Sequence, residues 1–202
     1  MAALHAREYV YFSPDDNIAQ QLITFIDNEQ RSIQMAAYCF THRGIASALI
    51  KAHKRGVLVE LVVDTFALES AVMVDIIKAE IPIYIFDPLC CIDQSPRPIK
   101  NKKKQPQAAL MHNKCIIFSC NIEHRPWVWT GSFNFTYQAN DRNQENCVIV
   151  DAPAVIDRFR GQFEILKQRC MLYERYIEPS AEFKRDSYWG NITQWVTEVF
   201  TW

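Results

Sequence analysis

A β-branched and almost continuously apolar segment, Val57–Val63, places the strongest constraint on the fold. Such a segment is typical of a strand that helices cover on both faces. Segments with helical periodicity flank it at Ile45–Ala52 and Glu69–Ala79, and a further strand is predicted at Ile83–Phe86. This order predicts an α/β protein, built as a three-layer α/β/α sandwich around a mixed, mainly parallel central sheet. Asp64 then lies at the carboxyl end of a strand, where open α/β sheets place their sites.

The N-terminal part predicts a strand at Glu8–Phe12 followed by a helix. Ser13 is suited to cap that helix, and Pro14 to occupy its first position. The next strand is predicted at Ser32–Phe40, and Gly56 marks the end of the second helix. The first helix should bury one stripe of apolar side chains, namely Ile18, Leu22, Phe25 and Ile26.

The strand–helix order breaks at Asp87–Leu110, a long segment rich in proline and lysine. Loops of this length in compact domains are usually functional or disordered. The pattern after it predicts a hairpin, formed by Lys114–Ser119 and Trp127–Thr130, and then a helix from about Phe133. A strand at Asn146–Val150 and a helix at Ala152–Arg169 follow.

The length of 202 residues is sufficient for one catalytic domain, residues 1–170. Residues 171–202 form an aromatic-rich extension that either packs on this domain or serves as an interface. A net charge of −1 means that affinity for nucleic acid or membranes needs a local patch. Seven scattered cysteines indicate a reducing compartment rather than a disulfide framework. No secretion signal or integral membrane segment is recognisable, so a cytoplasmic protein is expected.

His112 and Lys114 are the candidate catalytic pair. Residues two apart on a strand point to the same face, so both side chains should project together, with Asn113 turned away. The ammonium attracts a phosphate and favours the neutral, nucleophilic form of the imidazole. This pair predicts attack on a phosphodiester without a metal or any other cofactor.

A second group of residues is expected to hold the phosphate. The block Gly131-Ser132-Phe133-Asn134 is predicted to open a helix, so that its backbone N–H groups, the Ser132 hydroxyl and the Asn134 amide bind phosphate oxygens. Glu145 is expected to accept the second imidazole N–H and to fix the tautomer. Asn143 lies two residues before this carboxylate.

These blocks together, His112-Asn113-Lys114, Gly131-Ser132-Phe133-Asn134 and Asn143-Gln144-Glu145-Asn146, resemble the signature of the phospholipase D superfamily. The upstream run from Tyr38-Cys39-Phe40 to Asp64 resembles the first half of that family. The resemblance extends from about Tyr9 to Leu166. It is closest to the small single-motif members, which are the bacterial metal-independent endonucleases and the mitochondrial cardiolipin hydrolase/Zucchini nuclease.

The resemblance implies a mechanism and a homodimer with a shared active site. One histidine attacks the phosphodiester to give a phosphohistidine, and the histidine of the second copy protonates the leaving oxygen. The implied catalytic residues are His112, Lys114, Ser132, Asn134 and Glu145. Gly131 and Asn143 are expected to bind substrate, together with the lysines of the long loop, Lys100, Lys102, Lys103 and Lys104.

The sequence departs from the family pattern at two places. Ser119 stands where the family has an aspartate, and strand parity should place it away from the phosphate face. The connection from Ser119 to Gly131 is also longer than in the small nucleases, so Asn121–Pro126 is expected to protrude as a hairpin tip.

Three functions remain open from the sequence. A nuclease acting on DNA or RNA is favoured by the lysine-rich loop and by the likeness to the small nucleases. A phospholipase acting on cardiolipin or phosphatidylcholine would need an apolar site mouth, which the C-terminal aromatic residues could supply. A pseudoenzyme that binds phosphodiesters or a partner is suggested by Ser119.

Overall fold

The computed structural model describes residues 6–87 and 109–174 of the chain. Its centre is an eight-stranded sheet with the strand order β1-β7-β6-β5-β2-β3-β4-β8. In chain order the strands are β1 Glu8–Ser13, β2 Ser32–Ala37, β3 Leu58–Asp64, β4 Ile83–Phe86, β5 Lys114–Phe118, β6 Trp127–Gly131, β7 Glu145–Val150 and β8 Met171–Leu172.

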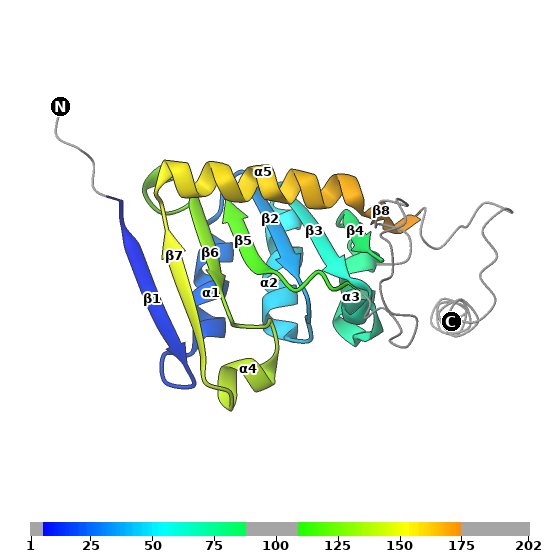
Figure 1. Cartoon of the computed structure of the whole chain (residues 1–202), viewed down its shortest axis with the longest axis horizontal. Coiled ribbons are helices and arrows are strands. Elements are labelled where there is room, and N and C mark those ends of the chain that lie inside the picture. The colour runs from blue at the N-terminus through cyan, green and yellow to red at the C-terminus, as the bar shows by residue number, and fades with distance from the viewer. Residues whose placement is uncertain (1–5, 88–108, 175–202) are drawn as a thin grey trace, which may run out of the picture.

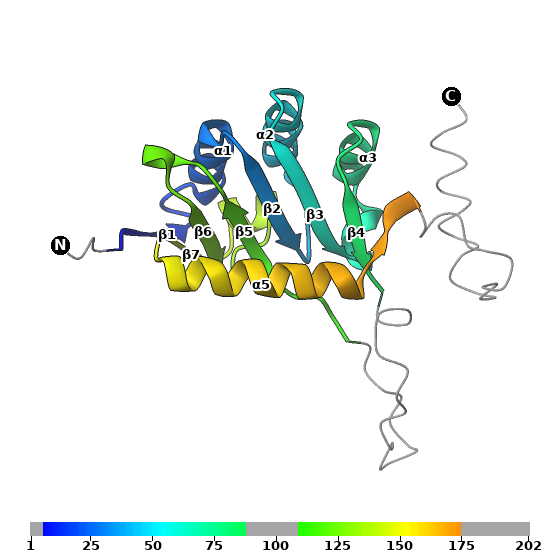
Figure 2. The same ribbon diagram turned by 90° about the horizontal axis from the view of Figure 1, so that it is seen from above.

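Helices cover both faces of this sheet. One face carries α1 (Ile18–Asn28), α2 (Arg43–Lys54) and α3 (Ala71–Lys78), and the long helix α5 (Pro153–Arg169) crosses the opposite face (Figures 1 and 2). The predicted three-layer α/β/α sandwich is therefore confirmed. None of the helices in the described ranges combines the length and the apolar character needed to cross a bilayer.

Two apolar layers explain why the central strands lack a polar face. In β2, Met35 and Ala37 belong to the layer beneath α1–α3, whereas Ala36 belongs to the layer beneath α5. Both layers are closed to water, and the buried α5 side chains Phe163 and Ile156 are 2% and 1% exposed. Burial of each such side chain contributes on the order of 1.5–3 kcal/mol to folding.

The sheet is mixed as predicted, but the expectation that it is mainly parallel was wrong. Only β2 with β3 and β3 with β4 pair in parallel; the other five neighbouring pairs are antiparallel. The periodicity of the first half indicated the two β-α-β units correctly. The second half adds an antiparallel β5-β6-β7 meander beside β2, and β1 joins the far side of that meander.

The predicted start of the first helix was also wrong. Helix α1 begins at Ile18, and Asn17 caps it by accepting a hydrogen bond from the Gln20 amide. Ser13 is instead the buried last residue of β1. Its hydroxyl donates to the carbonyl oxygens of Ala139 (2.7 Å) and Asn143 (3.1 Å), so it is bound by long-range partners that helix-capping rules do not consider.

One edge of the sheet, here called the site edge, gathers the candidate chemistry. Strands β2, β3, β4 and β6 end there, and β5 and β7 begin there, because β5 runs antiparallel to β2 and each meander strand reverses the one before. This edge lies at the bottom of Figure 1, on the side of the short helix α4 (Tyr137–Asp141). Asp64 lies at this edge, as predicted.

Ser119 lies at the opposite edge. Its amide donates to the Ser32 carbonyl oxygen (3.1 Å), and its hydroxyl pairs with that of Ser32. It is five positions after Lys114, a span of roughly 16 Å along an extended chain. The turn after it does not simply protrude, because Asn121 is buried and its side-chain Nδ2 donates to the Phe25 carbonyl oxygen (2.8 Å).

Candidate active site

His112 and Lys114 lie together at the site edge, as strand parity predicts. The Lys114 Nζ atom is 2.8 Å from His112 Nε2 and 3.0 Å from the His112 carbonyl oxygen. Lys114 is 7% exposed, so the ammonium is largely enclosed by protein. An ammonium can only donate hydrogen bonds, so Nε2 is the acceptor in this contact.

Tyr38 supports both members of this pair, a role that the sequence did not indicate. Its ring meets the His112 ring edge-on, with centroids 4.5 Å apart, and Lys114 Nζ lies 5.1 Å from its centroid. On its other side Tyr38 stacks on Phe66 at 5.5 Å. An aromatic residue following an apolar strand resembles an ordinary core residue, so only the fold reveals this contact.

Replacing Tyr38 with Leu is expected to lower the rate of phosphodiester cleavage about tenfold, equivalent to ~1.4 kcal/mol of the barrier. The variant loses the ring that orients His112 and faces the Lys114 ammonium. Tyr38→Phe retains the ring and should keep the wild-type rate. Steady-state rates and melting temperatures of both variants separate lost orientation from lost folding. Full activity of Tyr38→Leu would contradict a positioning role.

Asp64 fixes the segment that precedes His112. Its carboxylate is 2% exposed and accepts hydrogen bonds from the backbone amides of Met111 (2.9 Å) and Phe66 (3.1 Å). The end of β3 therefore holds both the segment that precedes His112 and the residue that stacks on Tyr38. Asp64 acts on the geometry of the site through the backbone.

Gly131 allows β7 to approach the end of β6 closely. A Cβ atom at this position would lie 2.2 Å from the Asn146 carbonyl oxygen and 2.8 Å from the Cys147 Cα. Ser132 continues the approach, because its amide donates to the Asn146 carbonyl oxygen and its hydroxyl accepts from the Asn146 amide, both at 3.1 Å. Its own hydroxyl proton is left for another acceptor.

The expectation that Gly131–Asn134 opens a helix was wrong. Helix α4 starts at Tyr137, where the Thr136 hydroxyl caps it by accepting from the Ala139 amide (3.1 Å). The preceding residues are held extended because the Phe135 amide donates to the Cys39 carbonyl oxygen (3.2 Å). The amides of Gly131–Asn134 therefore do not form a helix N-terminus. Phosphate binding here must rely on side chains such as Ser132 and Asn134.

Asn134 carries an unpaired group. Its Oδ1 atom is buried and has no hydrogen-bond partner among the described residues. An unsatisfied buried acceptor costs about 1–3 kcal/mol, and exceptions of this kind require an explanation such as a functional role. The Phe135 backbone ties this loop to the end of β2, beside Tyr38. Asn134 is therefore placed at the site edge with spare hydrogen-bonding capacity.

Glu145 makes a different contact from the one expected. No hydrogen bond joins it to His112 within the described ranges; its Oε1 atom instead accepts from the side-chain Nδ2 of Asn143 at 3.0 Å. Burial lowers the pKa of Lys114, and the nearby Glu145 carboxylate opposes that shift. The structure thus links Glu145 to Asn143 and, electrostatically, to Lys114.

Glu145→Gln is expected to move the alkaline limb of the pH–rate profile to lower pH. The carboxylate favours the charged form of Lys114, so its removal lowers the lysine pKa further. In the variant, the Lys114 ammonium therefore loses its proton at a lower pH than in the wild type. The measurement is kcat/KM against pH. Glu80→Gln, a matched change of an exposed residue after α3, should leave the profile unchanged.

The remaining predicted binding residues lie outside the described part of the chain. These are the loop lysines Lys100, Lys102, Lys103 and Lys104. Within residues 6–87 and 109–174, no group of three or more His, Cys, Asp or Glu side chains is arranged to hold a metal ion. The proposed site is therefore described by His112, Lys114, Ser132, Asn134, Asn143 and Glu145, with Gly131 shaping the backbone.

Comparison with known proteins identifies the family of the chain. The family described as cardiolipin synthase, PLD-like domain, matches residues 22–167, which include every described candidate residue. The chain belongs to the phospholipase D superfamily. This is a family of phospholipase D-like phosphodiesterases. The family match ends within α5, before β8.

Several phospholipase D relatives match about three quarters of the chain. A protein named phospholipase D from Rickettsia felis is 31% identical over 150 residues, 73% of this chain and 63% of that protein. The mitochondrial cardiolipin hydrolase of Xenopus tropicalis is 25% identical over 155 residues, 76% of this chain and 62% of that protein. The chain thus spans less than two thirds of the length of these relatives.

Two solved structures match over a larger share of the chain. The phospholipase D family member Nuc from Salmonella typhimurium has a TM-score of 0.63 and 27% identity, covering 84% of this chain and 99% of Nuc. NucT from Helicobacter pylori has a TM-score of 0.67 and 19% identity, covering 84% of this chain and 100% of NucT. The second likeness concerns the fold alone.

Proposed function

We propose that this protein is a metal-independent nuclease that hydrolyses phosphodiester bonds of DNA or RNA. The observation that carries the proposal is the 2.8 Å contact between His112 Nε2 and Lys114 Nζ at the site edge. It joins a nucleophile and a fixed cation, which are the two groups that attack on a phosphate requires. Ser132 and Asn134 lie on the neighbouring loop and supply further polar groups for the phosphate oxygens.

The proposed reaction has two steps. In the first, His112 Nε2 forms a bond to phosphorus while the bond to the leaving oxygen breaks, and that oxygen takes a proton from an acid. In the second, water attacks phosphorus, the P–N bond breaks, and the same acid–base group accepts the water proton. Lys114, Ser132 and Asn134 neutralise and orient the non-bridging oxygens throughout.

A homodimer across the site edge would provide the missing acid. The described residues contain one His–Lys pair, and a two-fold axis would bring a second His112 to the same phosphate. Large exposed side chains around this edge support such an interface, since Phe66 is 51% exposed, Leu110 57% and Tyr137 46%. Burying apolar residues of this kind is typical of the centre of a protein–protein interface.

Two observations favour nucleic acid as the substrate. The sequence resembles the single-motif endonucleases, and a lysine-rich segment immediately precedes the catalytic strand. A phospholipase remains the second candidate, because the exposed Phe66 and Leu110 could equally contact lipid, and because curated relatives are named for lipid substrates. A cytoplasmic location stays a prediction from cysteine usage.

The test is a substrate panel with EDTA present throughout. Purified protein is incubated with labelled single-stranded DNA, single-stranded RNA and duplexes, and in parallel with cardiolipin or phosphatidylcholine vesicles. Cleavage of a nucleic acid is the expected result. Hydrolysis of lipid without cleavage of any nucleic acid would overturn the nuclease proposal and establish the phospholipase. Absence of both activities would favour the pseudoenzyme.

A further inference from the structure

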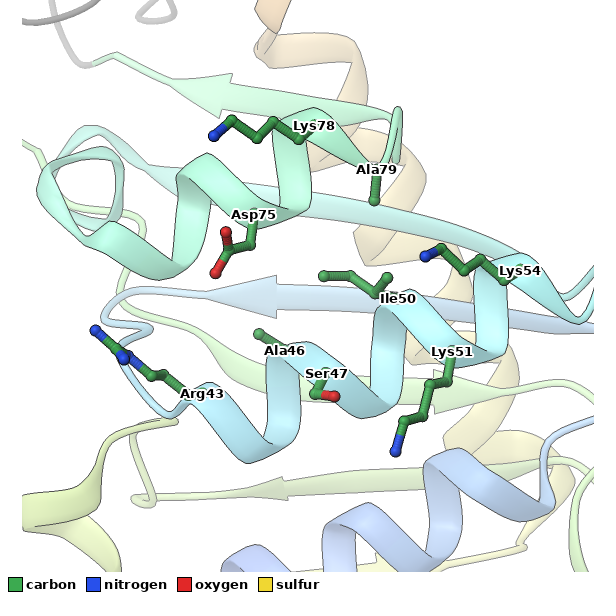
Figure 3. A pocket seen from close by; sticks show the side chains of 9 residues that line it. All are labelled: Arg43, Ala46, Ser47, Ile50, Lys51, Lys54, Asp75, Lys78 and Ala79. Carbon is green, nitrogen blue, oxygen red and sulfur yellow. The ribbon is translucent and has the colours of Figure 1, made fainter. Parts of the chain in front are cut away.

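A cationic groove lies between α2 and α3, on the outer helical face and away from the catalytic pair. It has a volume of about 560 Å³. Its floor is formed by Ala46, Ile50 and Ala79. Figure 3 shows Arg43 at one end, Lys54 near the other, and Asp75 and Lys78 across the groove on α3.

The charges of this groove are strongly unbalanced. The residues that line it include four cations, Arg43, Lys51, Lys54 and Lys78, but one carboxylate, that of Asp75. All four cations are exposed, and none takes part in an ion pair of the described ranges. A concave surface lined mainly by one sign of charge raises the local concentration of oppositely charged ligands. The groove is therefore suited to an anionic ligand.

The Arg43 end of the groove is linked through the backbone to the loop that carries Asn134. Arg43 is the first residue of α2 and follows the end of β2 at the site edge. The amides of Thr41 and His42 both donate to the Phe135 carbonyl oxygen at 3.0 Å, which joins the start of α2 to the loop carrying Asn134. A nucleic-acid strand that leaves the candidate active site past this loop would meet the Arg43 end of the groove.

The distribution of the cations indicates the class of ligand. Arg43 and Lys54 are eleven residues apart on α2, roughly 16 Å along the helix axis. Charges spread over this length match a chain of phosphates better than a single phosphate group. A membrane surface is less suitable, because the large exposed hydrophobic residues of the described ranges include none that line the groove.

We infer that the α2–α3 groove binds the phosphate backbone of a single nucleic-acid strand that extends beyond the active site. This inference rests on the proposed nuclease function and adds a binding track distinct from the catalytic residues. The groove binds without base readout, through Lys and Arg contacts to phosphates. It predicts that long strands bind more tightly than short ones.

The test measures binding of labelled single strands of about 6 and about 30 nucleotides by fluorescence anisotropy over a range of salt concentrations. The double variant Lys51→Gln/Lys54→Gln is expected to weaken binding of the long strand about tenfold. Its slope of log affinity against log salt should fall by about 1.4, because each phosphate contact on a single strand contributes about 0.7. Binding and cleavage of the short strand should not change.

The control removes the same charge from the opposite layer. Arg158 and Arg169 are exposed on α5, so Arg158→Gln/Arg169→Gln should leave both slopes at wild-type values. A second groove variant, Arg43→Gln/Lys78→Gln, is measured as well, so that a local folding defect in one of the two groove variants does not decide the result. An unchanged slope in both groove variants, or an equal loss in the control, would overturn the inference.

Two further outcomes are informative. If the groove variants lose binding to cardiolipin-containing vesicles but keep long-strand binding, the groove serves a membrane and the inference is wrong. If wild-type protein cleaves no nucleic acid while the groove variants still lose long-strand affinity, the proposed nuclease function fails and the groove assignment stands.

Discussion

Replacing His112 with Asn is expected to reduce phosphodiester cleavage by about 10⁴-fold or more, because the variant has no nucleophile that can form the phosphohistidine. Asn preserves polarity and approximate size, so Lys114 and Tyr38 should keep their places. The measurement is single-turnover cleavage of a labelled oligonucleotide with enzyme in excess. Wild-type protein quenched in alkaline detergent should carry the labelled phosphoryl fragment on an acid-labile, base-stable bond, and the variant should carry none.

His124→Asn provides the matched control. His124 lies in the turn at the opposite edge of the sheet and has a positive φ of 56°, a conformation that Asn adopts readily. This variant should retain wild-type activity. Residual cleavage by His112→Asn within about tenfold of wild type would show that another group performs the attack. The assigned nucleophile would then be wrong, even if the substrate were correct.

Gly131→Ala is expected to destabilise the protein by at least about 3 kcal/mol and to abolish activity with it. The new Cβ atom would lie 2.2 Å from the Asn146 carbonyl oxygen, so either β6 or β7 must move. That movement would break the paired Ser132–Asn146 hydrogen bonds and displace Glu145. Urea unfolding monitored by circular dichroism measures the change in the free energy of unfolding.

Gly161→Ala tests whether the effect belongs to the site edge. Gly161 is in α5, and a Cβ atom there would meet nothing within 4 Å. Alanine has a higher helix propensity than glycine, so the free energy of unfolding of this variant should rise by roughly 0.5–1 kcal/mol and its activity should stay unchanged. A Gly131→Ala variant as stable as wild type would mean that the close approach of the two strands is not required.

Local patterns in the sequence predicted much of this fold. The continuous apolar strand and the flanking helical stripes predicted the layers, because a strand that is buried on both faces is apolar at almost every position. The predicted strand Ile83–Phe86 is found with the same bounds, and α5 begins within one residue of its predicted start. His112 and Lys114 were predictable as a pair because strand parity is a local rule.

The errors arose where distant backbone partners decide the local conformation. The segment before Tyr137 has a sequence suited to an early helix start, but the Cys39 carbonyl oxygen holds Phe135 in an extended form. Ser13 looks like a helix cap, but its hydroxyl is used by residues more than 120 positions later. The antiparallel meander likewise depends on which strand β5 pairs with, and local sequence patterns do not predict this pairing.

The hydrogen bond from Lys114 to His112 has a consequence for selectivity. In the proposed mechanism the Nε2 lone pair attacks phosphorus, and the hydrogen bond from the Lys114 ammonium masks this lone pair. Charge-assisted hydrogen bonds to phosphate oxygens are stronger than one to a neutral ring nitrogen, so an arriving phosphate can draw the ammonium away. Neutral electrophiles, such as esters and amides, offer the ammonium no hydrogen bond of comparable strength. Under the proposed mechanism, Lys114 thus both recognises the anion and frees the nucleophile. We therefore expect the resting protein to be unreactive toward neutral electrophiles.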